Sequence, residues 1–211
     1  MLFPLYGRRE GVRLALGLHP LEVVKIDLAR ELSLFRSYAA HTSYIGEIGL
    51  DLSHEGKPSQ CVQEEVFDAL LMTPGVANKV LSVHSRGASR EIIRRLRDAQ
   101  ARRVILHWFS GSTRDLETAL DAGFYFSINP AMARSVRGRD IITSLPRERV
   151  LAETDGPYVR IRGRELEPKD VLLVHDYLAT QWRVPAAVVA EVLAHNLARL
   201  CHGLPASSPT E

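Results

Sequence analysis

The sequence predicts an α/β fold with a parallel sheet, of the TIM-type (β/α)8 barrel kind. Two observations carry this prediction. Short β-like runs alternate with amphipathic helical patterns from one end of the 211-residue chain to the other, which is typical of βα units. Polar residues able to bind metal follow several of these runs, and the C-terminal ends of the strands are where such barrels build their active sites.

Six strands are expected, each a short and mostly apolar run. They are Arg13–Leu16, Tyr44–Ile48, Val80–Val83, Arg103–Leu106, Phe124–Ile128 and Arg149–Ala152. Between them lie segments whose apolar residues recur at helical spacing. These are Asp27–Ala40, Gln60–Leu71, Ala88–Gln100, Thr113–Ala122 and Met132–Ser144. Ser112 is the expected N-cap of the fourth helix.

Two further helices, Lys169–Gln181 and Pro185–Leu200, are expected after the last strand. The second begins with proline at a position that helices tolerate, and it carries an apolar stripe from Val188 to Leu200. Both should pack on the outside of the barrel. The chain has no repeats or linkers, so it is expected to form one domain over residues 1–211, with a polar C-terminal tail over 202–211.

Composition excludes several classes of protein. With 45% hydrophobic and 25% charged residues, the chain is suited to a globular domain with a substantial core. No apolar run is long enough for a membrane span and the opening residues do not resemble a signal peptide, so we expect a cytoplasmic protein with no membrane partner. Cys61 and Cys201 are far apart, which indicates neither a disulfide framework nor a cysteine zinc site. A net charge of +2 is too mild to indicate nucleic-acid binding by itself.

The residues that could carry chemistry stand at the ends of the expected strands. In chain order the motifs are GLHP (Gly17–Pro20), GEIGLD (Gly46–Asp51), VHSR (Val83–Arg86), LHWFSG (Leu106–Gly111) and ETDGP (Glu153–Pro157). Because parallel strands end at one edge of the sheet, these motifs should meet at one rim.

Each of these side chains has an ordinary structural explanation when it is considered alone. A single histidine such as His84 or His107 can be a hydrogen-bonded core residue, Glu47 can pair with an arginine, and Asp155 can cap a helix. Together, however, two imidazoles and two carboxylates on one rim are a ligand set suited to zinc, manganese or a similar divalent ion. The combination predicts a metal site.

In this order, the five motifs resemble those of the TatD family of metal-dependent deoxyribonucleases, in the amidohydrolase superfamily. The resemblance covers nearly the whole chain and includes the HNLARL ending, His195–Leu200. The segments WFSGS, SINPAM and LPRERVLAETDGP are more similar still to QatD, the TatD-like nuclease of Qat anti-phage defence clusters.

The resemblance implies a barrel hydrolase with two divalent metals that cleaves phosphodiester bonds, often as an exonuclease on single-stranded DNA or RNA. It implies that Glu47 bridges both metals, that His84 and His107 complete the second metal's shell, and that Asp155 binds the first metal and helps to activate water. Candidate ligands of the substrate phosphate are His19, Arg86 and Ser110, of which Arg86 is the strongest because a guanidinium pairs well with phosphoryl oxygens. Anti-phage defence proteins are the implied partners beside nucleic acid.

The sequence departs from the family pattern at its start, since the H-x-H motif that ends the family's first strand does not occur in it. GLHP belongs to the family's third strand, so we expect an incomplete barrel that lacks two βα units. Glu47, His84 and His107 keep a His2Glu set, whereas the other site keeps only Glu47 and Asp155. This chain is expected to hold one metal at most, of an identity open among Mg, Mn, Zn and Ni.

Two other functions remain open from the sequence. One is a truncated, non-catalytic fragment or binding subunit, which the missing H-x-H favours. The other is an amidohydrolase acting on esters or amides, which is disfavoured because the bridging position holds Glu47 and the four lysines lie away from the strand ends. Trp108 also has two interpretations, since it could stack a base or pack in the core.

Overall fold

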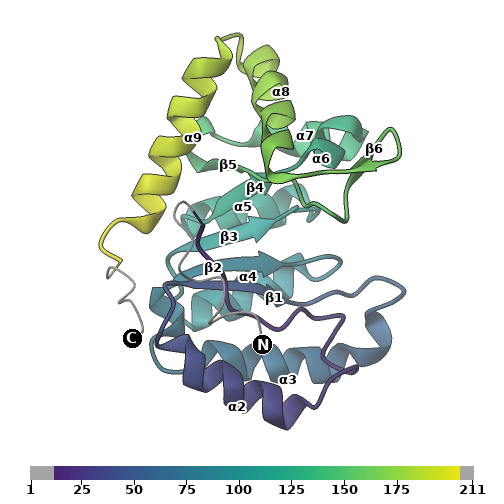
Figure 1. Ribbon diagram of the computed structural model, residues 1–211, viewed down its shortest axis with the longest axis vertical. Helices are drawn as coiled ribbons and strands as arrows, with labels where there is room; N and C mark the ends of the chain where they lie inside the picture. Colours follow the sequence, from purple (N-terminus) through teal and green to yellow (C-terminus); the bar gives the residue numbers. More distant parts are fainter. Residues whose placement is uncertain (1–11, 205–211) are drawn as a thin grey trace.

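The computed structural model describes residues 12–204, and its centre is a five-stranded parallel sheet (Figure 1). The strands follow one another across the sheet in chain order: β1 (Tyr44–Gly49), β2 (Val80–His84), β3 (Val104–His107), β4 (Tyr125–Ile128) and β5 (Val150–Ala152). Every neighbouring pair is parallel. The predicted α/β fold with a parallel sheet is confirmed, but within residues 12–204 the sheet does not close into a barrel.

The first predicted strand, Arg13–Leu16, is wrong as a strand. Of this run only Leu16 pairs with the sheet, in an isolated parallel bridge to Ile45 of β1. The Leu16 N–H donates to Tyr44 O at 3.0 Å, and the Gly46 N–H donates to Leu16 O at 2.9 Å. Gly17 follows so close to β1 that a Cβ there would stand 2.6 Å from Glu47 O, and the pairing with β1 does not extend beyond Leu16.

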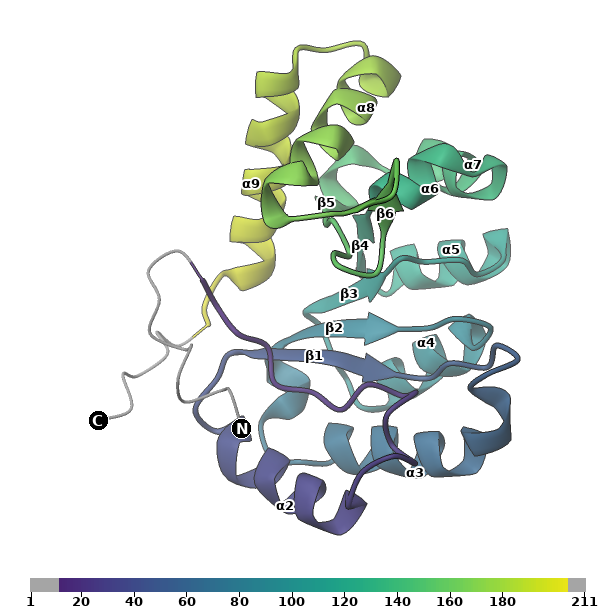
Figure 2. The ribbon, with the colours of Figure 1, turned by 45° about the vertical axis from the view of Figure 1, so that its right-hand side comes forward.

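Helices connect the strands and cover the sheet. In chain order they are α2 (Leu28–Ala39), α3 (Gln60–Leu71), α4 (Ser89–Asp98), α5 (Thr113–Asp121), α6 (Pro130–Arg134), α7 (Val136–Ser144), α8 (Leu172–Trp182) and α9 (Ala186–Cys201). Short 3-10 turns lie at Lys57–Ser59, Val76–Asn78, Arg147–Arg149 and Pro168–Val171. Figure 2 shows α2 and α3 beyond the β1 edge, α8 and α9 beyond the β5 edge, and α4 and α5 behind the strands.

The core lies between the sheet and these helices. Phe67, Ile92, Leu106, Phe124 and Phe126 are at most 1% exposed, and they come from strands and helices alike. Burial of such side chains is worth about 1.5–3 kcal/mol each, so the core holds the strand ends in place. The regular spacing of such buried residues along each helix explains why the positions of the helices were predicted well. The predicted N-cap Ser112 is also confirmed, since its hydroxyl accepts a hydrogen bond from the Asp115 N–H.

One predicted helix, Met132–Ser144, is wrong as a single element. It is broken at Ser135, whose extended backbone ends α6 and begins α7. The Ser135 hydroxyl accepts a hydrogen bond from the Gly138 N–H at 2.9 Å and so caps α7. The helical spacing of apolar residues runs through the break and hides it, because a serine inside a helical pattern can act as a new N-cap.

Between β5 and α8 the chain forms a small hairpin that the sequence did not predict. It consists of β6 (Arg160–Ile161) and β7 (Arg164–Glu165), joined by Arg162 and Gly163, both in the left-handed region. Within residues 12–204 no single helix is long and apolar enough to cross a membrane. The segments Pro168–Trp182 and Ala186–Cys201 reach that length and apolarity only together, and they are bent by 108° where they meet. The predicted polar tail lies largely outside the described residues, which end at 204.

Candidate metal and active site

Parallel strand pairing brings the predicted site residues together. His84 and His107 are the last residues of β2 and β3, and they are direct partners in the register of those strands. On the other side, His84 is the partner of Gly49, two residues after Glu47. Residues spread over 60 positions of the chain, from Glu47 to His107, thus meet at the C-terminal edge of the sheet, as the sequence predicts.

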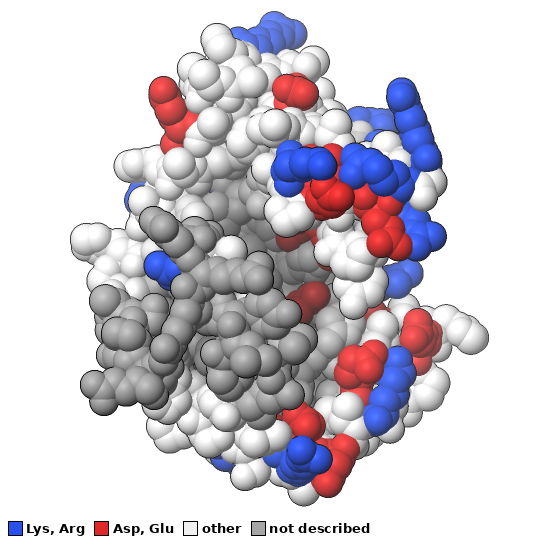
Figure 3. Space-filling view, in the orientation of Figure 1, with Lys and Arg blue, Asp and Glu red and all other residues white. Residues whose placement is uncertain are grey.

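A pocket of about 860 Å³ opens at this edge. It is lined by all seven predicted site residues: His19, Glu47, His84, Arg86, His107, Ser110 and Asp155. In Figure 3 this face of the molecule is hollowed near its middle, and acidic side chains are visible inside the hollow. The structure therefore places every predicted ligand and phosphate-binding residue in one cavity.

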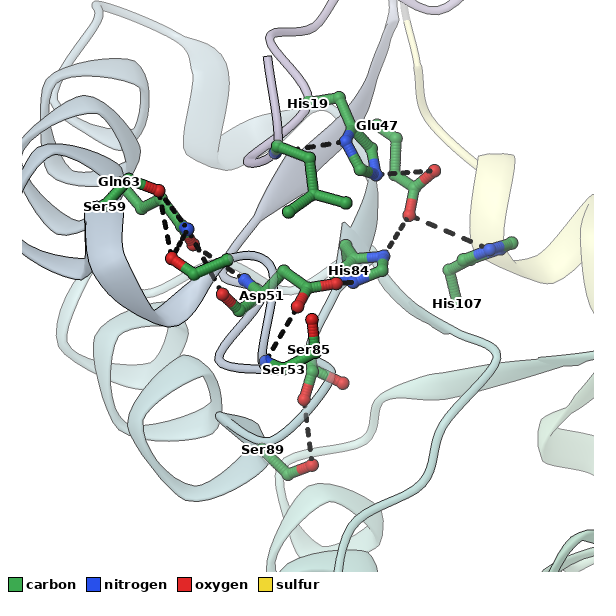
Figure 4. A network of polar contacts seen from close by, with 12 residues as sticks. His19, Glu47, Asp51, Ser53, Ser59, Gln63, His84, Ser85, Ser89 and His107 are labelled. Carbon is green, nitrogen blue, oxygen red and sulfur yellow. Dashed lines mark hydrogen bonds and ion pairs between the residues drawn. The ribbon is translucent and has the colours of Figure 1, made fainter. Parts of the chain in front are cut away.

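Glu47 is the centre of the cluster (Figure 4). Its Oε1 lies 2.8 Å from His84 Nδ1 and 3.7 Å from His107 Nε2, and its Oε2 lies 3.9 Å from His19 Nε2. His107 Nε2 also lies 3.3 Å from Asp155 Oδ1. His19, Glu47 and His84 form a group whose potential ligand atoms all lie within 4.8 Å of one another.

Both central imidazoles lie between carboxylates. His84 faces Glu47 through Nδ1 and Asp51 Oδ2 through Nε2, each at 2.8 Å. His107 faces Glu153 Oε2 through Nδ1 at 2.6 Å, with Asp155 and Glu47 beyond Nε2. A neutral imidazole has one N–H, which can donate to only one of the two carboxylates beside it. The other ring nitrogen then faces a carboxylate with no proton between them, and this contact needs a positive charge. A cation shared by the pocket sides of the two rings, with the outer carboxylate of each ring accepting the remaining N–H, satisfies these contacts. The residues present therefore fit a divalent metal.

The two outer carboxylates are themselves held in place. Asp51 is 1% exposed and accepts from the Ser53 N–H at 2.8 Å, while its own N–H donates to Gln63 Oε1 at 2.8 Å. Glu153 accepts from the Ser127 hydroxyl and, at 3.1 Å, from Asn129 Nδ2. Such outer partners fix the orientation of ligand imidazoles.

Asp51 and Glu153 lie inside the motifs GEIGLD and ETDGP, but neither residue was predicted to belong to the site. A signal was available, because each is an acidic residue at a strand end within a few positions of a predicted ligand. Gln63 gave no signal, since it lies in the first turn of α3 and reaches Asp51 only through the folded loop.

The electrostatics of the metal-free pocket favour charged groups. Burial of the His107 ring opposes its protonation, but contacts with Asp155 and Glu153 outweigh burial and raise the pKa of His107 to about 11. Burial likewise raises the pKa of Glu47, but the hydrogen bond to His84 and the charges of His107 and His84 outweigh it, so that pKa lies below its usual range. Glu47 is therefore ionised at neutral pH, as a metal ligand must be.

His19 differs from the other two histidines. Its Nδ1 accepts a hydrogen bond from the Leu21 N–H at 3.3 Å, so a neutral ring carries its proton on Nε2, the atom that faces Glu47. Burial lowers the pKa of His19, more than the nearby Glu47 raises it, and this favours the neutral ring. A protonated Nε2 is a hydrogen-bond donor and not a metal ligand.

Two site residues have unusual backbone conformations. Trp108 has φ +38° and Asp155 has φ +52°, both in the left-handed region that non-glycine residues rarely adopt. Each costs about 1–3 kcal/mol, and such costs concentrate at functional sites. Nearby, Gly49 permits the close approach of β1 to β2, because a Cβ at that position would stand 2.0 Å from His84 O.

The chain is similar to known proteins over most of its length. The TatD related DNase family matches residues 5–202. The uncharacterized metal-dependent hydrolase YcfH of Escherichia coli is 32% identical over 211 residues, covering 94% of this chain and 77% of the relative. Human deoxyribonuclease TATDN3 is 29% identical over 201 residues, with 88% and 72% covered.

Solved structures show the same relationship. The crystal structure of the Escherichia coli TatD homologue YJJV superposes with a TM-score of 0.83 at 26% identity, covering 94% of this chain and 80% of that one. A TatD family hydrolase from Entamoeba histolytica shares the fold, with a TM-score of 0.76 at 16% identity and coverage of 94% and 78%. The chain belongs to the TatD related DNase family, and with it to the hydrolases that act on ester bonds.

Proposed function

We propose that this protein hydrolyses phosphodiester bonds of nucleic acid, with a divalent metal held by Glu47, His84, His107 and Asp155. The observation that supports the proposal most directly is the pair of imidazoles enclosed by carboxylates in a pocket that also holds Arg86. When bound, a divalent ion at this site would lower the pKa of water and offset charge on phosphoryl oxygens.

The chain's own residues bind and orient the phosphate. Arg86 lines the pocket and makes no ion pair within residues 12–204, so its guanidinium is available to pair with phosphoryl oxygens. His19 presents a protonated Nε2 to the same pocket and can donate a second hydrogen bond. Ser110 also lines the pocket, in a loop fixed by Arg137, whose Nη2 donates to Ser110 O at 2.7 Å.

We further propose that the substrate is single-stranded DNA cleaved from an end, and that the protein acts in the cytoplasm in anti-phage defence. This part rests on the sequence resemblance to QatD in WFSGS, SINPAM and LPRERVLAETDGP. The metal count is proposed to be one, because the His2Glu set is complete whereas no H-x-H motif is present in the sequence for a second ion.

The test is hydrolysis of an end-labelled single-stranded oligonucleotide by the purified chain with Mg, Mn, Zn or Ni. Glu47→Ala is the loss-of-function variant, and Glu117→Ala is the matched control, since Glu117 lies in α5 and does not line the pocket. We expect metal-dependent cleavage that Glu47→Ala reduces by at least about a hundredfold. Loss of one terminal nucleotide at a time would support an exonuclease, and internal fragments would contradict that mode.

The second candidate function is a non-catalytic binding subunit, which the lack of an H-x-H motif favours. It predicts oligonucleotide binding without hydrolysis under every metal. Equilibrium metal binding decides how many ions are held: one ion per chain agrees with the proposal, and two would show that ligands outside the His2Glu set suffice.

A further inference from the structure

Two aromatic side chains stand at the mouth of the pocket without packing into the core. Trp108 is 39% exposed and Tyr158 is 87% exposed, and both line the same pocket as His107 and Asp155. Trp108 directly follows His107, and Tyr158 comes three residues after Asp155. The two most exposed aromatic rings on this rim therefore come from the loops that carry two of the predicted metal ligands.

Trp108 does not serve as the packing residue of its loop. That role belongs to the next residue, Phe109, which is 1% exposed and packs edge-to-face on Phe126 with ring centroids 5.4 Å apart. The loop holds Trp108 outward at the cost of a left-handed backbone with φ +38°. A large ring kept exposed under strain loses stability that a core position would provide, which indicates a binding role.

The loop after β5 is built in the same way. Val159 is 5% exposed and anchors the loop, since its N–H donates to Asp155 O at 2.9 Å and its carbonyl accepts from Leu166 at 3.1 Å. Tyr158, one position earlier, is left in solvent. In each loop one residue fixes the backbone and its neighbour presents an aromatic face.

The spacing of the two loops suits a planar ligand. β3 and β5 are separated by β4 alone, so the loops start about 9.6 Å apart, twice the usual distance between strands. Flat rings with exposed faces recognise the face of a nucleobase, and this stacking tolerates any base. We propose that Trp108 and Tyr158 form a nucleobase-binding site beside the catalytic pocket, which takes the base next to the phosphate that is cut. The proposal rests on the proposed function and adds to it the feature that selects unpaired nucleic acid, because a base inside a duplex has no free face.

Binding can be measured without hydrolysis. The chain has two tryptophans, and Trp182 lies in α8 under the guanidinium of Arg147, outside the pocket. In Trp182→Phe the fluorescence reports on Trp108 alone. Titration with a single-stranded oligonucleotide, in chelator to prevent cleavage, should quench this emission. The same oligonucleotide with abasic residues at the end that enters the pocket should bind about 5- to 140-fold more weakly, as expected for loss of one stacked base. Equal affinity and no quenching would overturn the proposal.

A second set of variants separates stacking from a structural role. The abasic oligonucleotide should bind the unsubstituted chain about 5- to 140-fold more weakly than the intact oligonucleotide does. For Trp108→Ala or Tyr158→Ala, the difference in affinity between the two oligonucleotides should be much smaller. Trp108→Phe should restore most of the base dependence, and Trp182→Phe should leave it unchanged. A purely structural role for Trp108 would weaken both oligonucleotides equally and contradict the proposal. If no oligonucleotide is hydrolysed under any metal, the proposed function fails, while the binding measurements still decide whether bases stack here.

Discussion

Two clusters of charged side chains in this molecule are balanced in different ways. On the outer helices, Arg95 is enclosed by carboxylates: its Nη2 lies 3.0 Å from Glu64 Oε2, its Nε lies 2.6 Å from Glu91 Oε1, and Nη1 contacts Asp68. In the pocket, Glu47, Asp51, Glu153 and Asp155 surround two imidazoles.

Both clusters contain more carboxylates than permanent cations, but their solvation differs. The acidic partners of Arg95 are 27%, 34% and 47% exposed, so water offsets their excess charge. In the pocket, Asp51, Glu153 and Asp155 are 1%, 16% and 15% exposed and Glu47 is 26% exposed, and within residues 12–204 the groups that pair with these four carboxylates are imidazoles. The outer cluster is complete in water, whereas the pocket requires a cation from outside the chain.

The largest expected effect of this difference is stabilisation by metal. At a free metal concentration a hundred times the Kd, the free energy of unfolding should rise by about 2.7 kcal/mol. For a chain of this size that corresponds to an increase in Tm of about 5–11 °C. Differential scanning fluorimetry with Zn or Mn checks it, with chelator as the reversal. An unchanged Tm in the parent chain, or an equal rise in Glu47→Ala, would contradict the comparison.

The next effect concerns the outer partner of His84. Asp51→Asn keeps the shape of the side chain but removes the charge that fixes the imidazole, so metal affinity should fall about 10- to 100-fold. Isothermal titration with the metal that gives the largest Tm rise measures this change. Asp98→Asn is the matched control, because Asp98 pairs with Arg94 on the outer surface at 2.7 Å, and its metal affinity should equal that of the parent chain.

A smaller effect is expected from the outer cluster. Arg95→Leu removes three ion pairs on half-exposed carboxylates, and the free energy of unfolding should fall by about 1–2 kcal/mol. Urea denaturation measures this loss. Hydrolysis per folded molecule should stay within about twofold of the parent chain, since the outer cluster balances its charge without the pocket. A large loss of activity in folded Arg95→Leu would show that the two regions are coupled.

A further effect distinguishes the clusters by pH. In the metal-free chain the pKa of His107 is raised from 6.5 to about 11, so its stabilising contacts are fully present below about pH 6.5 and are lost as the pH rises toward 11. The hydrogen bond from Arg94 lowers the pKa of Glu91 from 4.5 to about 2, so that contribution is present above 4.5 and is lost as the pH falls toward 2. His107→Gln should remove only the alkaline loss, and Glu91→Gln only the acid loss, in Tm measured across pH.

Sequence reasoning succeeded where a local pattern determines the structure. The apolar runs located β1 to β5 to within a residue or two, and the polar residues after them indicated the pocket, because strand ends share one edge. It failed where tertiary contacts decide. Arg13–Leu16 has the composition of a strand but pairs through Leu16 alone, and Ser135 interrupts a helical pattern that continues on both sides. The core interpretation of Trp108 was wrong because Phe109, next to it, takes the buried position.

Because His84 and His107 are paired in the register of β2 and β3, the site tolerates changes in loop length but not shifts within either strand. The 22 residues between them can lengthen or shorten at the turns before β3 without moving either imidazole, because hydrogen bonding between β2 and β3 sets their relative height. A one-residue slip within either strand would displace one imidazole by about 3.3 Å and turn it to the opposite face of the sheet. Loop length before β3, at the edge of the sheet away from the pocket, can therefore vary without moving the two imidazoles, while the phase of each strand is fixed.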